Sequence, residues 1–356
     1  DPFSPAFDPK FSDNADISQL SYAITSHNQF VSSWLSTLRL GEGIDESVTF
    51  SALGPFTPVS RSLFKTKQRQ YSWQNDISLP LGTLTLLYDR LEERVKSTTN
   101  FDKDSRNNNG YLVGYLVNYG NHSLQANYRS DHNSQFGTND TGGLGYGYSF
   151  NENWRVTGSY GTAFKAPTFN DLFFPGFSNP NLEPEKSRNL EASLRYETSQ
   201  NSASLTIYEN KIRDLIALDF QTPPFVFNTN KARIQGLTLA GGWRWDNWQL
   251  NGSLDVQSPR DEETDNLLVR RANRHASANL SKTWGDWYFG VEVIASSNRY
   301  NDAANDQRLS GYTIFNLATD YKISQDWKLQ ARVNNLFDKN YALAFDGDPS
   351  AGGFVY

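Results

Sequence analysis

Segments in which every second residue is apolar or aromatic recur from one end of this chain to the other. In the clearest of them, Tyr111, Val113, Tyr115, Val117 and Tyr119 alternate with Leu112, Gly114, Leu116 and Asn118. A period of two predicts β-strands, because successive side chains of a strand point to opposite faces of a sheet. We expect about sixteen long strands of this kind, with a seventeenth beginning after Gly352. They are predicted at 15–26, 28–40, 66–79, 83–95, 108–119, 122–132, 141–150, 153–164, 186–197, 203–216, 225–241, 247–258, 270–283, 287–299, 310–323 and 327–337.

The length of these segments distinguishes between two all-β architectures. Most have about 10 to 14 residues, roughly twice the ~5 to 6 residues typical of strands in a soluble sandwich. Ten residues that rise ~3.3 Å each and tilt by ~45° cover about 23 Å, close to the apolar band of an outer-membrane barrel. No apolar run reaches the ~18 residues that a membrane-spanning helix needs. The predicted fold class is therefore all-β, a transmembrane antiparallel β-barrel.

Short and long connections alternate along the chain. Trp residues gather where the strands meet the short turns, as in the aromatic girdle of a membrane barrel. Tight turns at one end and long loops at the other are typical of bacterial outer-membrane barrels, in which the short turns are periplasmic. Short turns are expected around His27, Pro80, Gly120, Asn151, Gln200, Asp246, Gly285 and Gln325. Long connections are expected at 41–65, 96–107, 133–140, 165–185, 217–224, 259–269, 300–309 and 338–350.

Composition and motifs exclude several classes of function. The 356 residues include no Cys and no Met and carry a net charge of -6. Disulfides, thiolate metal sites and Cys catalysis are thus excluded, and a basic nucleic-acid-binding face is not expected. The chain contains neither a nucleophile elbow, a phosphate-binding glycine loop nor a His-Glu-x-x-His motif, so we do not expect an enzyme.

An open sheet of this kind presents a physical problem in lipid. Each free edge would expose roughly ten backbone groups that cost several kcal/mol apiece in hydrocarbon. We therefore expect residues 1–356 to be the C-terminal part of one larger barrel domain that begins inside an external loop. The first residue is Asp1 and not Met, which also suggests a processed or cut chain.

Several motifs resemble those of one family along almost the whole chain. They are SYGTAFKAPTFNDL (159–172), NPNLEPEKS (179–187), KARIQG (231–236), NNLFDKNY (334–341) and RSDHNSQFG (129–137). On these motifs the sequence resembles the TonB-dependent outer-membrane receptors, and RSDHNSQFG resembles in particular their vitamin B12 (cobalamin) branch. Leu237 and Thr238 depart from the family, in which a hydrophobe and Glu usually follow KARIQG.

The resemblance implies a fold, partners and an activity. It implies a 22-stranded barrel, of which about 17 strands would be present here, closed by an N-terminal plug that carries the TonB box and lies outside this sequence. The activity would be uptake of cobalamin from extracellular loops into the periplasm, driven by the TonB complex through the plug. We expect a monomer in outer-membrane lipid, without a covalent cofactor and without nucleic acid.

Other substrates and one other class of membrane protein remain open. A ferric siderophore receptor would use clustered Arg and aromatic residues in its external loops. A haem receptor resembling this family would place a His in residues 168–178, where this sequence has none. A passive porin would lack the plug and the NNLFDKNY motif, and a soluble carbohydrate-binding sandwich would not need lipid.

Cobalamin is large and rich in amides, so polar and aromatic side chains at loop tips are the expected binding residues. Acidic residues near the start of the chain offer hard oxygen ligands for Ca²⁺ at loose spacing. The substrate-binding candidates are Phe56, Phe64, Asn107, Asn108, Asn109, Phe173, Phe174, Phe177, Phe225, Arg271 and Tyr300. The Ca²⁺ candidates are Asp1, Asp8, Asp13 and Asp16.

Overall fold

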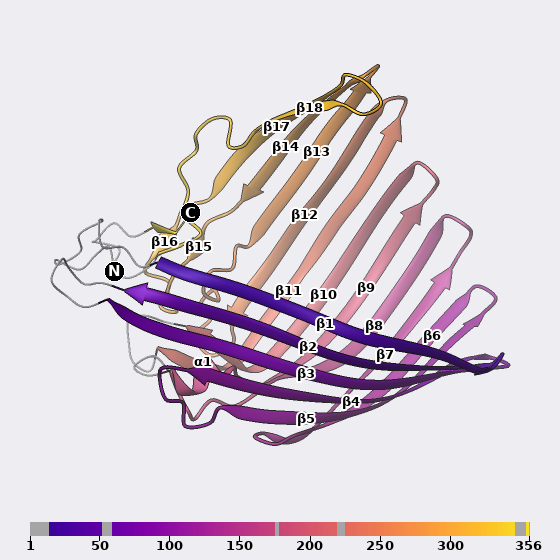
Figure 1. The fold of residues 1–356 in the computed structure, drawn as a ribbon. Coiled ribbons are helices and arrows are strands. Elements are labelled where there is room, and N and C mark those ends of the chain that lie inside the picture. Colours follow the sequence, from indigo (N-terminus) through magenta and orange to yellow (C-terminus); the bar gives the residue numbers. More distant parts are fainter. Residues whose placement is uncertain (1–13, 52–58, 175–177, 219–224, 346–353, 356) are drawn as a thin grey trace.

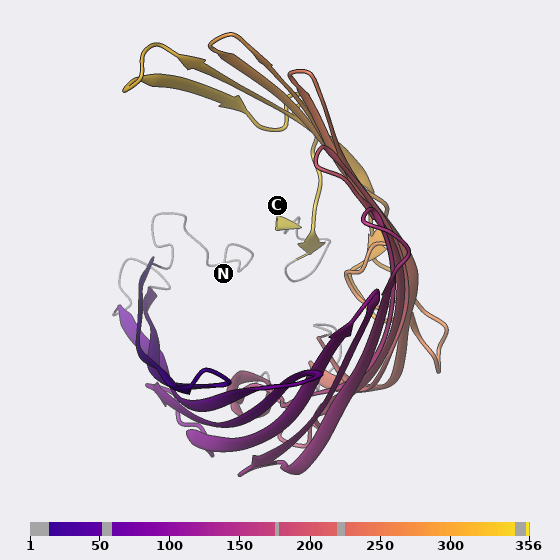
Figure 2. The same cartoon turned by 90° about the vertical axis from the view of Figure 1, so that its right-hand side faces the viewer.

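One curved antiparallel sheet dominates the structure (Figure 1). The computed structural model describes residues 14–51, 59–174, 178–218, 225–345 and 354–355. Its main sheet has 16 strands, and each pairs with the strand that precedes and follows it in the order β1 to β14, β17, β18. Figure 2 shows that the sheet curves around a hollow interior, with β1 and β18 at its two separate edges. The predicted all-β, antiparallel architecture is confirmed.

The strands of the main sheet follow the predicted series. They are β1 Asn14–Val31, β2 Trp34–Ser51, β3 Ser60–Leu79, β4 Gly82–Ser97, β5 Ser105–Tyr119, β6 His122–Asn133, β7 Gly137–Ser149, β8 Trp154–Lys165, β9 Glu185–Glu197, β10 Asn201–Leu218, β11 Val226–Trp245, β12 Trp248–Asp261, β13 Arg274–Trp284, β14 Trp287–Ser296, β17 Tyr312–Lys322 and β18 Lys328–Val333. The remaining elements are short: α1 Phe169–Phe173, β15 Arg299–Tyr300 paired with β16 Arg308–Leu309, and β19 Ala344–Phe345 paired with β20 Phe354–Val355.

The two faces of the sheet differ in exposure and in chemistry. Along β9 the exposed Leu190 and Leu194 alternate with the half-buried Glu191 and Ser193. Side chains spread apart on the convex face of a curved sheet and crowd together on its concave face, so the exposed apolar series lies outward. A row of direct cross-strand partners continues this outward apolar face across five strands: Tyr115, Ala126, Leu144, Tyr160 and Leu190.

The tyrosines that define the period-two pattern lie on this outward face. Tyr111 and Tyr119 share a face with Tyr115, and these two residues are 52% and 72% exposed. A barrel wall in lipid requires this arrangement, with an apolar convex face and a polar concave face.

The short turn predicted around His27 is wrong. The turn expected around His27 is absent, because β1 runs through it to Val31 and His27 pairs directly with Thr37. The polar residues near His27 indicated a turn, but the ring nitrogen Nδ1 instead lies 3.1 Å from the Thr37 hydroxyl across the ladder. The chain reverses further on, at residues 32–33.

The long connection expected at 41–65 is also mostly strand. β2 continues to Ser51 and β3 begins at Ser60. Cross-strand ion pairs extend this hairpin past the apolar band, with Lys65 Nζ 2.7 Å from Glu46 Oε2 and Lys67 Nζ 2.8 Å from Glu42 Oε1. Charged residues that sequence patterning assigns to loops are therefore strand residues here.

Of the helical residues that the structure describes, none forms a segment long and apolar enough to cross a membrane.

Candidate substrate site at the long-loop end

The concave wall carries a tightly paired charge cluster near the long loops. The Arg129 guanidinium on β6 donates to Asp89 Oδ1 at 2.6 Å from Nη1 and to Asp131 Oδ2 at 2.8 Å from Nε. Asn108 Nδ2 donates to Asp131 Oδ1 at 2.6 Å. Charge-assisted pairs of this geometry are among the stronger hydrogen bonds in proteins. The cluster joins three neighbouring strands, β4, β5 and β6, across the inner surface.

A glycine makes room for this cluster. Gly110 lies on β5 between Asp89 and Asp131, its direct partners on the two neighbouring strands. A Cβ at this position would lie 1.9 Å from Arg129 Nη2. The absence of a side chain therefore lets the guanidinium cross the strand and reach both carboxylates.

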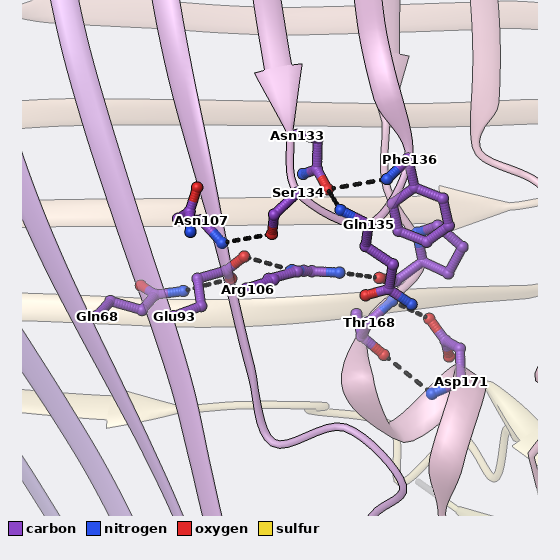
Figure 3. Close-up of polar contacts among 11 residues, drawn as sticks. Gln68, Glu93, Arg106, Asn107, Asn133, Ser134, Gln135, Phe136, Thr168 and Asp171 are labelled. Atoms are coloured by element: carbon purple, nitrogen blue, oxygen red, sulfur yellow. Dashed lines mark hydrogen bonds and ion pairs between the residues drawn. The ribbon is translucent and has the colours of Figure 1, made fainter.

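A second concave arginine connects the wall to the long loop between β8 and β9 (Figure 3). Arg106 Nε lies 2.5 Å from Glu93 Oε2, and its Nη1 donates to the carbonyl of Pro167 at 2.6 Å. The guanidinium also stacks over the Phe169 ring, 4.7 Å from the ring centroid. Because the Arg106 side chain is only 8% exposed, these contacts fix the loop against the inner wall.

That loop is organised by a one-turn helix with a complete capping box. Thr168 Oγ1 accepts from the Asp171 backbone N–H at 3.1 Å, and the Thr168 N–H donates to Asp171 Oδ2 at 2.8 Å. The helix α1 then buries Leu172 against Leu182 and Val226. The motifs 159–172 and 179–187 thus build a small folded unit at the long-loop end of the wall (Figure 3).

A small pocket lies beside this unit, between the loop ends of β10 to β12 and the loop that follows β12. Its volume is about 170 Å³, and apolar side chains such as Leu215, Phe227 and Leu268 line it together with Arg271. Arg271 Nη1 has one distant backbone acceptor, the Val269 carbonyl at 3.5 Å. Within the described ranges no carboxylate lies within ion-pair distance of Arg271.

The electrostatics of Arg271 follow from this position. Burial lowers the pKa of the Arg271 guanidinium from its usual value, and the nearby Glu185 carboxylate acts in the opposite direction. Glu185 Oε1 is itself occupied by Lys165 Nζ at 3.2 Å and by the Ile216 N–H at 3.0 Å. A half-buried cation with free donors beside an apolar surface is suited to an amide or phosphate oxygen of a large ligand.

The structure brings several of the predicted binding residues to this end and separates others. Asn108 joins the Arg129 cluster, and Phe64 lies on the concave side of β3 with its ring 6.0 Å from that of Phe101. Asn107 and Asn109 lie on the convex face, because β5 already begins at Ser105 and its residues alternate. Asn109 Oδ1 accepts there from Tyr88 and Arg90, at 3.1 and 3.2 Å.

The remaining aromatic candidates have different surroundings. Phe173 packs against the small core around Leu172, whereas Phe174 is exposed at the end of α1. Phe225 precedes β11 and is half-buried, and the carbonyl of Tyr300 in β15 accepts from the Arg270 N–H at 2.7 Å. Phe56 and Phe177 lie outside the described residues.

Of the four Ca²⁺ candidates, Asp1, Asp8 and Asp13 lie outside the described residues. Asp16 is an exposed residue of β1 opposite Val48. Across the described ranges, no group of three or more His, Cys, Asp or Glu side chains is placed to hold a metal ion.

Sequence reasoning missed the residues that organise this end of the wall. Arg129 belongs to the RSDHNSQFG motif, but its partner Asp89 is 40 residues away, and Arg106 is 61 residues from Pro167. Only the register of β4 to β6 brings these groups together. Alternation along the strands could have placed both side chains on the inner face. Asp89 is one residue from the outward Tyr88, and Arg106 is an odd number of residues from the outward Tyr111.

The folded loop, the polar inner wall and the greasy outer face together define a receptor-type membrane barrel. The family model "TonB dependent receptor-like, beta-barrel" matches residues 2–336, and the chain belongs to this family. Its members are receptors and not enzymes, and they are outer-membrane proteins of Gram-negative bacteria. The predicted class, non-enzymatic character and location are confirmed by this membership.

Two curated relatives carry the name vitamin B12 transporter BtuB. The one from Photobacterium profundum is 32% identical over 314 residues, which is 86% of this chain and 51% of the relative. The one from Vibrio vulnificus is 29% identical over 306 residues, 84% of this chain and 49% of the relative. The chain thus spans about half the length of the curated relatives it matches.

Solved structures share the fold at lower identity. The copper transporter OprC has a TM-score of 0.80 and 17% identity, covering 92% of this chain and 62% of that one. A mutant of the ferric enterobactin receptor PfeA from Pseudomonas aeruginosa has a TM-score of 0.77 and 18% identity, covering 93% and 58%. The siderophore receptor PirA from Acinetobacter baumannii has a TM-score of 0.74 and 17% identity, covering 91% and 59%.

Proposed function

We propose that the full-length protein is an active outer-membrane transporter that binds cobalamin at its extracellular loops and imports it into the periplasm with TonB-coupled energy. The observation that carries this proposal is the identity of 32% and 29% to two vitamin B12 transporters over most of this chain. The siderophore and copper receptors, at 17–18% identity, share the fold only.

In this proposal residues 1–356 supply the C-terminal wall and loops of a single barrel. The plug, the TonB box and the first strands belong to the part of the protein outside this sequence. The wall acts as scaffold, and the TonB complex acts on the plug. Lipid surrounds the barrel, which works as a monomer.

Within this chain the binding surface proposed for cobalamin is the long-loop end of the concave face. Arg271 beside its apolar pocket supplies unpaired donors, and the folded unit around α1 supplies the exposed Phe174. Phe64, Phe225, Asn108 and Tyr300 are further candidates of this surface, and Phe56 and Phe177 remain binding candidates from the sequence alone. The loops of such a site can match the many amide oxygens and the phosphate of cobalamin with hydrogen bonds and ring faces.

Equilibrium binding to the full-length protein in detergent tests the proposal. We expect saturable cyanocobalamin binding, weakened about 10- to 100-fold by Arg271→Gln, because a hydrogen bond from a charged group contributes about 1.5–3 kcal/mol. The matched control is Arg195→Gln at the short-turn end, where the guanidinium pairs with Glu197 at 2.8 Å. It should leave the affinity unchanged.

Three results, from this assay and from a conductance measurement, would overturn parts of the proposal. Tight binding of a ferric siderophore without saturable cobalamin binding would identify a siderophore receptor. Spontaneous ion conductance of the full-length protein in planar bilayers would identify a passive porin. Repeating the titration with Ca²⁺ and with a chelator tests the expected Ca²⁺ site of Asp1, Asp8, Asp13 and Asp16, and equal affinities would contradict it.

A further inference from the structure

Cations face cations in two rows on the convex surface of β9 to β12. The residues of each row are direct cross-strand partners, whose Cβ atoms lie about 5 Å apart in an antiparallel ladder. The first row is Arg188, Lys211, Arg233 and Arg260. The second row, one step nearer the long loops, is Lys186, Arg213 and Lys231. We refer to these residues as the cation rows.

The cation rows lie directly beyond the apolar band of the outer face. Arg188 is two residues from the exposed Leu190 on the same face of β9, a step of about 7 Å. On β10 and β11 the exposed Ile207 and Leu237 lie on the same face four residues from the first row, with Glu209 and Gln235 between them and the cations. In a barrel wall this height corresponds to lipid headgroups and not to hydrocarbon.

The protein provides little negative charge to compensate these rows. Glu209 Oε1 lies 3.3 Å from Lys211 Nζ, and Glu209 also pairs with Arg233. Arg260 pairs with Asp265 of the following loop at 3.2 Å. The other members, Lys186, Arg188, Arg213 and Lys231, have no carboxylate within 4.0 Å among the residues that the structure describes.

Rows of opposed cations destabilise the fold unless an anion from outside the chain neutralises them. Like charges directly opposite each other in a sheet are destabilising, and here they recur across three and four neighbouring strands. The whole chain is acidic, with a net charge of -6, so this concentration of positive charge is local. It indicates a binding surface for an anion.

The surface is also hollowed at this place. A cavity of about 330 Å³ is lined by Lys186, Arg188, Lys211 and Arg213, together with Phe164 of β8 and Asp140 of β7. Asp140 faces the cavity without an ion pair to these cations in the described part of the chain. An open cavity lined by four cationic side chains and one carboxylate can accommodate a phosphate group.

The outer face of β2 to β4 provides an internal comparison at the same end of the wall. There Lys65 pairs with Glu46 at 2.7 Å, and both Lys67 and Arg69 pair with Glu42 at 2.8 and 2.5 Å. Lys96 and Arg94 of β4 lie opposite Lys65 and Lys67. Lys65 and Lys67 are nevertheless each paired with a glutamate of β2. We call Lys65, Lys67 and Arg69 the paired cations.

We propose that the cation rows bind the phosphate groups of an outer-leaflet lipid whose headgroup carries more than one phosphate. Arg and Lys donate charge-assisted hydrogen bonds to phosphate, and Arg does so in a bidentate manner. A lipid, and not a free phosphate, is the proposed occupant because exposed apolar residues lie below the cations on the same face: Leu190 two residues away on β9, and Ile207 and Leu237 four residues away on β10 and β11. The acyl chains of the same molecule would pack against them.

Native mass spectrometry of the full-length receptor in detergent tests this site. The protein is titrated with bis-phosphorylated lipid A, monophosphoryl lipid A, phosphatidylglycerol and inorganic phosphate. The variant is Arg188→Gln/Lys211→Gln/Arg213→Gln, and the matched control replaces the paired cations, Lys65→Gln/Lys67→Gln/Arg69→Gln, which removes the same number of charges. We expect bis-phosphorylated lipid A to bind the wild type most tightly and to lose at least 10-fold in the variant, but less than 3-fold in the control.

Equal losses in the two variants, or no retained lipid in the wild type, would overturn the proposal. Inorganic phosphate binding as tightly as the lipid would also overturn it, because the site would then be one for a free anion.

A thermal readout keeps the test independent of lipid handling. In lipid-free detergent the variant should have a melting temperature equal to or above that of the wild type, because opposed like charges are removed. Bis-phosphorylated lipid A should then raise the melting temperature of the wild type but not that of the variant, and an equal rise would contradict the proposal. Cyanocobalamin affinity should be the same in all three proteins, so this result does not depend on the proposed transport function.

Discussion

The inner wall at β4 to β6 and the outer face of β9 to β11 differ in how positive charge is compensated at the long-loop end. On the inner face Arg129 contacts two aspartates and Arg106 contacts a glutamate and a backbone carbonyl. On the outer face of β9 to β11, Arg188 and Arg213 stand opposite further cations without a carboxylate of the described chain in reach. Arg129 and Arg106 are compensated by the protein itself and so hold its structure together. In our proposal Arg188 and Arg213 take their partner from the membrane.

The largest effect is expected from breaking the inner cluster. Arg129→Ala would leave Asp89 and Asp131 without their shared cation on the inner wall. Removing one partner of a largely enclosed ion pair costs about 3 kcal/mol. Urea unfolding of the protein in detergent should show this loss. The control Arg195→Ala removes an exposed pair with Glu197 and should cost less than about 1 kcal/mol; comparable losses would contradict the distinction.

A smaller loss is expected from closing the gap through which Arg129 passes. Gly110→Ala would place a methyl group 1.9 Å from Arg129 Nη2, so the guanidinium must move and lengthen its contacts. We expect about 1–2 kcal/mol of destabilisation, since overpacking of this kind costs about that much. Gly145→Ala on β7 is the matched control, because a Cβ there meets nothing within 4 Å. Equal melting temperatures for the two variants would show that Arg129 does not need the gap.

The folded loop between β8 and β9 should respond locally. Thr168→Ala removes the side-chain acceptor for the Asp171 N–H at the start of α1, and the loss of an N-cap costs about 1 kcal/mol. Hydrogen exchange of residues 168–174 should accelerate while exchange in β8 and β9 stays unchanged. Thr168→Ser retains the hydroxyl and should behave like the wild type. Faster exchange in the serine variant as well would show that the cap is not what orders the loop.

The smallest effect on stability is expected at Arg271. Burial lowers the pKa of this guanidinium, so folding disfavours its charged form. This cost to stability is fully present below the folded-state pKa and is relieved only as pH rises through it. At neutral pH the group is charged and uncompensated by a near carboxylate of the described residues. Arg271→Leu should therefore leave the melting temperature unchanged or raise it slightly. A clear loss of stability would show that Arg271 is a structural cation like Arg129.

The period-two pattern was sufficient to predict the sheet. Tyr111 to Tyr119 alternate on β5 as expected, and the exposed Leu190 and Leu194 on β9 lie on the same outward face. The pattern failed where polar residues continue a strand beyond the apolar band, as in β2 to Ser51 and β3 from Ser60. There the ladder is held by cross-strand charges, which alternation of hydrophobicity does not record.

The candidate site was less predictable, because it depends on register. The three asparagines at 107–109 were expected together at a loop tip, but strand β5 sends Asn108 inward and its two neighbours outward. Arg271 was predicted for its donors and proves to border a pocket. Alternation places Arg106 and Asp89 on the inner face, but it does not give their partners, which come from distant segments of the chain.

The central claim, that β9 presents one face to lipid and the other to the water-filled interior, has a direct measurement. Because residues 1–356 contain no cysteine, single cysteines at residues 188 to 194 can each carry a spin label in the full-length protein in bilayers, once any cysteine outside these residues is replaced. Labels at Leu190, Ala192 and Leu194 should collide with oxygen in the lipid, and labels at Glu191 and Ser193 with a water-soluble nickel complex. The same accessibility at all positions, or the opposite alternation, would contradict the account.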